Sequence, residues 1–478
     1  LTSNLSSILE QKEKFGQSEV LKNKKVMVEF TDPNPLKEFH IGHLYSNAVG
    51  EALSRLFESQ GAEVWRVCYQ GDVGLHVAKA LWGINSKLKS QNAKLEEIEK
   101  KPLPVRAKFL GEAYALGAAA YTDEKTKEEI IELNKKVYEK DPEIFPLYEK
   151  AKQWSLDYFE TIYKTLGTKF VKYYFESEAG PLGKQIVEEH MGDIFRKENG
   201  AVIFPKEKSG LHTRVFINSL GLPTYEAKEL GLAPKKYADF PYDTSIIVTG
   251  NEINEYFKVL LKALSLIKPD LAQKTKHVSH GMVKLPGGKM SSRTGDVITG
   301  DRLISETKSK IKETYEGTSE SLLSEIAVGA IKYTLLKSHI GADIVFDLNE
   351  SINLHGNSGP YLQYAYARTQ SILGKAQGIN REPSTVNREL AIEELDLLRT
   401  LVQFPEVVQR AQLEFAPSYI CTYLFDLTQK FSLFYEKHRV INAENEEIRD
   451  FRLILVAGVG QVLKNGLTLL GIKSPEKI

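Results

Sequence analysis

Cysteines and long apolar stretches are scarce in this sequence, and both shortages limit what the chain can be. Only Cys68 and Cys421 are cysteines among 478 residues, and they lie too far apart in sequence to suggest a disulfide framework or a paired-cysteine zinc motif. No stretch is apolar for long enough to cross a bilayer, and the polar opening LTSNLSSILEQKEKFGQSEV lacks the apolar centre of a secretion signal. We therefore expect a cytoplasmic protein with no membrane partner.

An excess of either charge is also missing. Lysine and arginine total 63, and aspartate and glutamate total 63, so a nucleic acid would have to meet local basic patches instead of a global positive field. The length leaves room for about three structural units. Because the first residue is leucine, we expect the chain to be a trimmed or processed piece of a longer protein.

The spacing of apolar residues predicts a parallel α/β fold in the first part of the chain. Alternating apolar side chains predict strands in KVMVEFT (25–31) and AEVWRVCY (62–69). Between them, apolar residues recur at helical spacing from Ile41 to a stop at Gly61. A strand, a helix and a second strand in this order are typical of a parallel sheet.

The same pattern returns after a long charged stretch. TSIIVTG (244–250) and KHVSHGMV (276–283) predict two more strands, whereas the charged segments at about 77–205 favour helices and look inserted. We predict an α/β protein in which a Rossmann-type catalytic domain, residues 25–300, is split by a mainly helical insertion. The other predicted parts are a remnant N-terminal segment (1–24), a helical connection (301–355) and an all-α C-terminal bundle (356–478).

Two histidines stand at the start of the first predicted helix. His40 and His43 place both imidazoles on one helix face, beside free N–H groups and the positive end of the helix dipole. Gly42 has no side chain, so a base or ribose can approach the backbone closely. The arrangement suits the phosphates of ATP, although two isolated histidines could instead bind nearby carbonyls. A metal site is not predicted, because H-E-x-x-H is absent and no third ligand is near.

A glycine-rich segment far downstream offers a second set of phosphate-binding groups. In HGMVKLPGGKMSSRTGDVIT (280–299), a loop with Lys289, Ser291, Ser292 and Arg293 can close over a bound triphosphate. It is not a Walker loop, because Ser or Thr does not directly follow Gly-Lys. Taken alone, the same loop could be an ordinary basic surface segment.

HIGH at 40–43, followed by KMSSR at 289–293, resembles the motifs of class I aminoacyl-tRNA synthetases. VEFTDPNPLKEFHIGH, GPYLQYAYARTQSIL and the tail VLKNGLTLLGIKSPEKI resemble arginyl-tRNA synthetases in particular. The resemblance covers nearly the whole chain from about residue 25. It implies an enzyme that activates L-arginine with ATP and Mg²⁺ and transfers it to tRNA(Arg). It also implies that most of the family's extra N-terminal domain is missing, which would weaken the affinity for tRNA.

The resemblance implies an arginine site as well. Glu29 and Asn34 match residues of that site in the family, and Tyr225 and Glu229, four residues apart on a helix, complete it. A carboxylate such as Glu29 can bind a planar guanidinium in bidentate fashion, and Glu229 can add a second acceptor. Without the resemblance, Glu29 and Glu229 could equally be solvent-facing acids and Tyr225 a core aromatic.

The resemblance further implies an adenine site where a strand leads into the KMSSR loop. There, backbone groups of His280, Gly281 and Met282 would read the adenine edge while Met282 packs on the ring, unless Met282 is a core residue. Ser292 stands where the family motif KMSKS has its second lysine. Lys37, three residues before His40, is our candidate for the missing cation, but it could also be a solvated loop lysine.

The C-terminal bundle would hold the anticodon stem and loop. PYLQYAYARTQ supplies aromatic side chains on which unpaired bases can stack, namely Tyr361, Tyr364 and Tyr366, with Arg368 beside them. An aromatic stripe at helical spacing is, however, often part of a core. Two alternatives stay open. The chain could be another class I synthetase, or a paralogue that binds tRNA or arginine without catalysis, because Ser292 and Ile253 depart from the family pattern. We expect a monomer.

Overall fold

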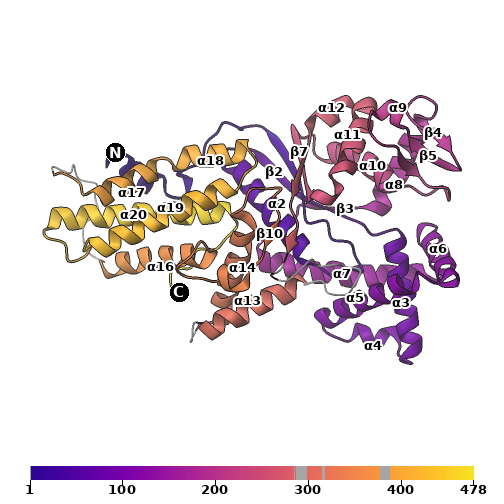
Figure 1. The fold of residues 1–478 in the computed structure, drawn as a ribbon, viewed down its shortest axis with the longest axis horizontal. Coiled ribbons are helices and arrows are strands. Elements are labelled where there is room, and N and C mark those ends of the chain that lie inside the picture. Colours follow the sequence, from indigo (N-terminus) through magenta and orange to yellow (C-terminus); the bar gives the residue numbers. More distant parts are fainter. Residues whose placement is uncertain (1, 285, 287–298, 315–317, 377–387) are drawn as a thin grey trace.

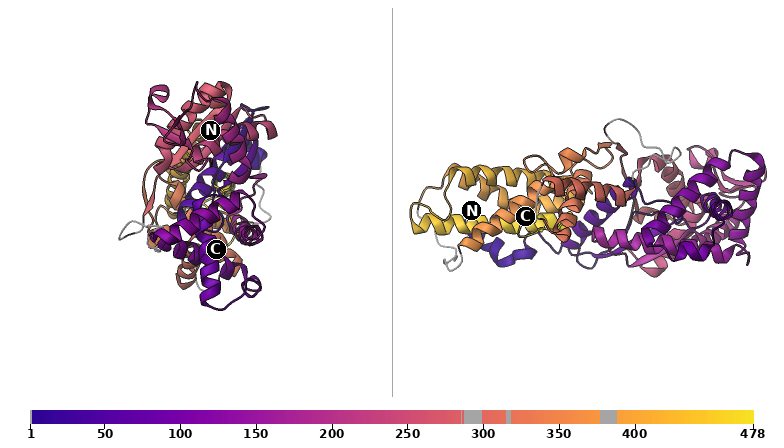
Figure 2. Two further views of the ribbon diagram at one scale, coloured as in Figure 1. Left: turned by 90° about the vertical axis from the view of Figure 1, so that its right-hand side faces the viewer. Right: turned by 90° about the horizontal axis from the view of Figure 1, so that it is seen from below.

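The computed structural model describes all residues except 1, 285, 287–298, 315–317 and 377–387. The molecule is elongated, with an α/β half and a helical half arranged along one long axis (Figures 1 and 2). Among the described helices, none is both long and apolar enough to span a bilayer.

A parallel five-stranded sheet lies at the centre of the α/β half. Its order is β3-β2-β1-β7-β8. The strands are β1 (Lys25–Glu29), β2 (Glu63–Gln70), β3 (Lys172–Phe175), β7 (Thr244–Gly250) and β8 (Thr275–His280). The chain builds the sheet outward from β1 on both sides, so the carboxyl ends of β1 and β7 flank the crevice in which sheets of this kind bind ligands.

The sheet is covered on both faces, which explains the nearly continuous apolar sequence of β1. Val26 and Val28 belong to a core with α2 (Ile41–Ser59), whereas Met27 points to the opposite face and packs near α10 (Tyr225–Asp239). All three side chains are buried. The predicted Rossmann-type sheet and its first strand-helix-strand unit are therefore confirmed.

A helical segment separates β2 from β3. It contains α3 (Leu75–Ser90), α4 (Leu95–Glu99), α5 (Leu103–Ala120), α6 (Glu124–Tyr138) and α7 (Phe145–Leu166). The predicted insertion, about 77–205, extends too far, because Lys172–Phe175 pair with Val67–Gln70 as part of the main sheet. A four-residue strand between helix-favouring segments carries too little periodicity to be recognised, and only its pairing with β2 reveals it.

A segment with three short strands and two helices follows β3. It contains α8 (Glu176–Glu189), β4 (Arg196–Glu198), β5 (Ala201–Phe204), α9 (Lys206–Ser209) and β6 (Arg214–Ile217), before α10 leads back to β7. The three strands form an antiparallel sheet. Between β7 and β8 the chain forms η2 (Asn251–Ile253), α11 (Asn254–Ile267) and α12 (Pro269–Lys274).

The helical half follows β9 (Val283–Lys284). This strand pairs in parallel with β10 (Ile344–Val345), which the chain reaches only after two of the connecting helices. The connecting helices are α13 (Gly300–Thr314), α14 (Glu320–Leu336) and α15 (Leu348–Ser351). The bundle consists of α16 (Gly359–Lys375), α17 (Ile392–Val402), α18 (Phe404–Leu413), α19 (Ser418–Lys437) and α20 (Glu446–Leu469), which confirms an all-α C-terminal part.

The first residues of the chain pack against this bundle. α1 (Thr2–Gln11) and η1 (Lys12–Lys14) lie beside the bundle helices in Figure 1. Asn465 of α20 donates from its amide nitrogen to the carbonyl of Lys12 at 2.9 Å and to that of Phe15 at 3.0 Å. The segment predicted as an N-terminal remnant is thus a structural part of the C-terminal bundle.

Candidate active site

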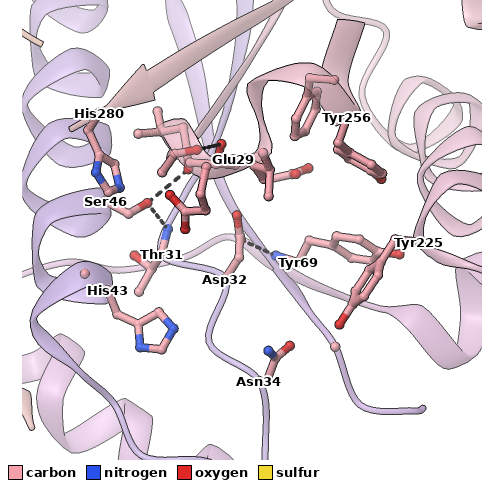
Figure 3. A pocket seen from close by; sticks show the side chains of 18 of the residues that line it. Glu29, Thr31, Asp32, Asn34, His43, Ser46, Tyr69, Tyr225, Tyr256 and His280 are labelled. Atoms are coloured by element: carbon pink, nitrogen blue, oxygen red, sulfur yellow. Dashed lines mark hydrogen bonds between the residues drawn. The ribbon is translucent and has the colours of Figure 1, made fainter. Parts of the chain in front are cut away.

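A cavity of ≈ 670 Å³ opens at the carboxyl ends of β1, β2, β7 and β8. Its walls bring together most of the predicted site residues: Glu29, Asn34, His40, Gly42, His43, Tyr225, Glu229, His280, Gly281 and Met282. In the view of Figure 3, His43 and His280 lie on one side, Tyr69, Tyr225 and Tyr256 on the other, and Glu29 between them. Lys37 does not line the cavity. Lys289, Ser291, Ser292 and Arg293 lie outside the described residues.

The loop after β1 has an unusual backbone that turns its side chains into the cavity. Thr31 has φ 80° and Asp32 has φ 43°. A positive φ is uncommon for residues other than glycine, and it is especially rare for a β-branched residue such as threonine. Strain of this kind persists only where surrounding contacts hold it. Thr31 N–H donates to Ser46 Oγ at 2.8 Å, and Tyr69 N–H donates to Asp32 Oδ1 at 2.7 Å. These bonds from α2 and β2 keep the loop between Glu29 and His40 in place.

The two histidines form a stacked pair at the start of α2. Their ring centroids are 3.7 Å apart. The backbone N–H of His40 donates to Nδ1 of His43 at 3.1 Å, so the neutral ring of His43 carries its proton on Nε2. The Nδ1 of His43 thus makes the capping-box bond at the start of α2 and does not bind a carbonyl. The Nε2–H of the same ring remains as a donor at the cavity wall.

Both histidines are neutral at physiological pH in the free chain. Burial lowers the pKa of His40 to about 4, and the nearby charges of Lys37 and His280 add to this effect. Burial also lowers the pKa of His43 well below its usual value, with contributions from His40 and Lys37. The pair can therefore donate hydrogen bonds to phosphate without carrying a positive charge.

The segment from His280 to Met282 is held from two sides. The Nδ1 of His280 lies 2.8 Å from the carbonyl of Gly281, and its ring lies 4.4 Å from that of Tyr45. The N–H of Met282 donates to Asp343 Oδ1 at 2.9 Å, so this group is already used. Met282 is 44% exposed, which excludes a core role.

Gly281→Ala is expected to lower the melting temperature. A Cβ at this position would lie 2.1 Å from the carbonyl oxygen of Ala342, so the backbone between β9 and β10 would have to move. Overpacking of this kind lowers the free energy of unfolding by about 1 to 3 kcal/mol. Gly374→Ala in α16 is the matched control, because nothing lies within 4 Å of its Cβ and alanine favours helices. Equal melting temperatures of both variants in a thermal scan would contradict the close packing at Gly281.

The acidic part of the cavity is formed by Glu29, Asp32 and Glu229, which we call the acidic slot. Glu29 is only 1% exposed, so it is not a solvent-facing acid, and its Oε2 accepts from Lys236 Nζ at 2.6 Å. The side chain of Glu229 makes no hydrogen bond or ion pair with the described residues. Burial and the charge of Glu29 raise the pKa of Glu229 well above its usual value, and the same two causes raise that of Asp32.

Tyr225 lies at the rim of this slot. It is 51% exposed in the first turn of α10, so it is not a core aromatic. Two other acids in the cavity are neutralised, because Glu176 accepts from Lys228 at 2.5 Å and Glu226 from Arg214 at 3.5 Å. Within the described part of the chain, Asp32, Glu229 and Glu252 have no such ion-pair partner. The slot is therefore ready for a cation.

Several residues of the cavity escaped the sequence reasoning. The hydroxyl groups of Tyr69 and Tyr256 are buried in its wall without a hydrogen-bond partner among the described residues, which marks them as candidate ligand contacts. Tyr69 lies near the carboxyl end of β2, and the rule that such ends bind ligands would have found it. Asp32 stands three residues after Glu29, but no pattern marked it as a site residue. Lys236 does not line the cavity, and only the fold brings it to Glu29.

A smaller cavity of ≈ 300 Å³ lies between α16 and α19. Tyr361, Tyr364, Arg368 and Tyr435 line it. The Arg368 guanidinium donates to the Tyr364 hydroxyl at 3.0 Å and lies 5.4 Å from the centre of the Tyr435 ring. Tyr366, predicted with the same stripe, is 4% exposed and belongs to the core instead.

Comparisons with known proteins identify the family of the chain. Residues 4–348 match the family described as "tRNA synthetases class I (R), catalytic domain", and residues 362–478 match the "DALR anticodon binding domain". The arginine–tRNA ligase of Parabacteroides distasonis is 32% identical, over 95% of this chain and 80% of that protein. That of Borrelia hermsii is also 32% identical, over 100% of this chain and 84% of that protein.

Solved structures show the same fold. Thermus thermophilus arginyl-tRNA synthetase superposes with a TM-score of 0.79 at 23% identity, over 99% of this chain and 86% of that one. The Plasmodium falciparum enzyme gives 0.77 at 22%, over 100% and 83%. The near full-length sequence matches favour neither another class I synthetase nor a non-catalytic paralogue. The chain belongs to the arginyl-tRNA synthetase family and is a class I arginine–tRNA ligase, with arginine, ATP and tRNA as substrates.

Proposed function

We propose that ATP binds at the amino end of α2 and that the arginine side chain enters the acidic slot. The single observation that carries this proposal is Glu229, a carboxylate without a cation partner among the described residues, in the same cavity as the stacked histidines. A guanidinium supplies the missing positive charge in a planar fork of donors. The substrate carboxylate then extends from the slot toward the histidines.

The first step is attack of the arginine carboxylate on the α-phosphorus of ATP. Pyrophosphate leaves, and arginyl-adenylate is the product. The Nε2–H of His43, the ring of His40 and the free N–H groups of α2 stabilise the charge that builds on the phosphates. In the second step, the 2′-hydroxyl of the terminal tRNA ribose takes the arginyl group, and AMP leaves.

Further cations are proposed for the phosphates. Lys289, Ser291, Ser292 and Arg293 supply donors from the KMSSR loop, and Lys37 replaces the second lysine of the family motif. The ammonium of Lys37 lies 4.7 Å from the centre of the Tyr114 ring, so it would have to leave that ring to reach a phosphate. Its charge is already felt by His40 and His43, which supports a place near the nucleotide.

Mg²⁺ is proposed to arrive with ATP. The described residues contain no group of three or more His, Cys, Asp or Glu side chains that could hold a metal ion. Magnesium commonly binds through substrate phosphates, several waters and only one or two carboxylates. Its chemistry here is to neutralise charge on the phosphates.

Arginine binding is expected to release a proton and to strengthen as the pH rises. The raised pKa of Glu229 means that the free chain keeps this carboxyl protonated over a wider pH range than usual. The guanidinium is charged throughout and favours the ionised carboxylate, so binding lowers the pKa again. Affinity therefore increases with pH until the raised pKa of the free chain is passed. Calorimetric titrations in buffers of different ionisation enthalpy measure the released proton.

L-citrulline is the control ligand for this titration, because it has nearly the same shape without the charge. Its binding is expected to be weak and to release no proton. Arginine affinity that is independent of pH, without proton release, would contradict an acidic slot that receives the guanidinium.

The small cavity of the bundle is proposed to receive an unpaired base of the anticodon loop. Tyr364 and Tyr435 offer ring faces for stacking, and Arg368 adds a planar cation beside them. The description of the matched domain as anticodon-binding supports this use. We also propose that the chain acts in the cytoplasm as a monomer. Its two cysteines are free and buried, as suits a reducing compartment.

A further inference from the structure

One member of the acidic slot, Glu29, forms a buried ion pair with Lys236, which does not line the cavity. Lys236 is 2% exposed and Glu29 1%, and their side chains meet at 2.6 Å. Removing two charges from water is costly, and pairs of this kind are often replaceable by apolar residues without loss of stability. Stability alone is therefore a weak reason for a lysine at this position.

The location of Lys236 links it to the substrate contact. Glu229 and Lys236 are seven residues apart on α10, so they lie on the same face of the helix, two turns from one another. Other titratable groups face Glu29 from the loop after β1, β2, β3, α10 and the turn before β7: Asp32, Tyr69, Tyr174, Glu229 and Tyr242. Among the described residues that face Glu29, Lys236 is the cation.

The charge of Lys236 therefore acts on all three carboxylates of the slot. Lys236 bonds directly to Glu29, while Asp32 and Glu229 feel its charge only at a distance. The bond ties Oε2 of Glu29 to a side chain that does not itself line the cavity. Asp32 already accepts a hydrogen bond from the N–H of Tyr69 at 2.7 Å, so Glu229 is the slot carboxylate whose side chain has no bond to another described residue and whose charge a bound guanidinium can balance.

We propose that Lys236 is a positioning residue for arginine recognition. It binds the Glu29 carboxylate, and the guanidinium of the substrate therefore pairs with Glu229. This inference rests on the proposed arginine slot. Without the lysine, Glu29 becomes a buried carboxylate without a counter-charge and takes up a proton, which binding must then remove.

Lys236→Met is expected to raise the KM for arginine at neutral pH by about tenfold or more, with a smaller change in kcat. The pH at which arginine binding is half-maximal moves upward by about one unit or more. Lys236→Arg keeps the charge and restores the wild-type pH dependence. The measurement is arginine-dependent ATP–pyrophosphate exchange of the full chain over a range of pH, with the KM for ATP and the melting temperature measured alongside.

Lys332→Met is the matched control for losing a buried lysine. Lys332 is 1% exposed, lies outside the cavity and donates to the carbonyls of Leu166 and Gly471 at 2.7 and 2.8 Å. Its loss is expected to lower the melting temperature without moving the pH dependence for arginine. A wild-type pH dependence in Lys236→Met would overturn the proposal.

A second comparison holds even if Lys236→Met does not fold. Glu29→Gln leaves Lys236 as an unpaired cation that repels the substrate, whereas Glu29→Gln with Lys236→Met removes both charges. The double variant is therefore expected to have the lower KM for arginine, and equal KM values would overturn the proposal. A failure of the slot itself is recognised separately, because Glu229→Gln would then bind arginine as the wild type does.

Discussion

Glu229→Gln is expected to lower kcat/KM for arginine by about 10²- to 10³-fold. The guanidinium would enter a slot in which Glu29 is already bound to Lys236. Of the slot's carboxylates, only Asp32, which already accepts a hydrogen bond from the N–H of Tyr69, would remain to balance its charge. Glutamine keeps the size of the side chain, so the loss reports the charge and not the shape. ATP–pyrophosphate exchange with varied arginine, with and without tRNA, measures the effect.

Glu226→Gln is the control on the same helix. Glu226 lines the same cavity, but Arg214 lies 3.5 Å from it, so its charge is already neutralised. We expect a much smaller effect on the KM for arginine. Glu229→Asp keeps the charge with a shorter reach and should retain more activity than Glu229→Gln. Equal activity of the wild type and Glu229→Gln would exclude Glu229 as the main partner of the guanidinium.

His43→Asn is expected to lower kcat by about 10²- to 10³-fold, with little change in the KM for ATP. The Nε2–H of His43 is proposed to stabilise charge that develops only as pyrophosphate leaves, so its loss affects the transition state more than binding. Asparagine can still accept from the backbone N–H of His40 near the position of Nδ1, but it has no donor at the position of Nε2. Single-turnover measurements of arginyl-adenylate formation separate the chemical step from binding.

His43→Gln is the informative partner of that variant. The longer amide reaches the position of Nε2 and can restore the donor while losing the acceptor for His40. If the donor carries the function, His43→Gln is more active than His43→Asn. The reverse order would show that the bond to the His40 backbone, and thus the start of α2, matters more than the donor.

Local patterns predicted much of the site and the sheet. The apolar alternation of β1, the helical spacing after Ile41 and the HIGH string correctly located α2 and its two histidines. The family resemblance selected Glu29, Asn34, Tyr225 and Glu229, and all four line one cavity. Apolar spacing and short motifs can be recognised without a structure, because they depend only on residues that are neighbours along the chain.

Other features depend on neighbours that are distant in sequence. β3 has four residues, and it is recognisable as a strand only through its partner β2. The first residues of the chain have no periodic partner nearby, yet Asn465 binds their carbonyls more than 400 positions later. The pattern of charged residues did not predict the ion pair in the slot, because Lys236 and Glu29 are separated by 207 residues and are both buried.

The sequence by itself determined the class of the protein, the parallel sheet and helical bundle, and the residue types that are proposed to meet ATP and arginine. Only the tertiary structure decided which carboxylate is already paired, which nitrogen of His43 carries the proton, and which aromatic side chains line a cavity. The physical reason is that motifs record which groups the chemistry needs. Burial and pairing, which set the charge and hydrogen bonds of those groups, arise when strands and helices that are far apart in sequence come together.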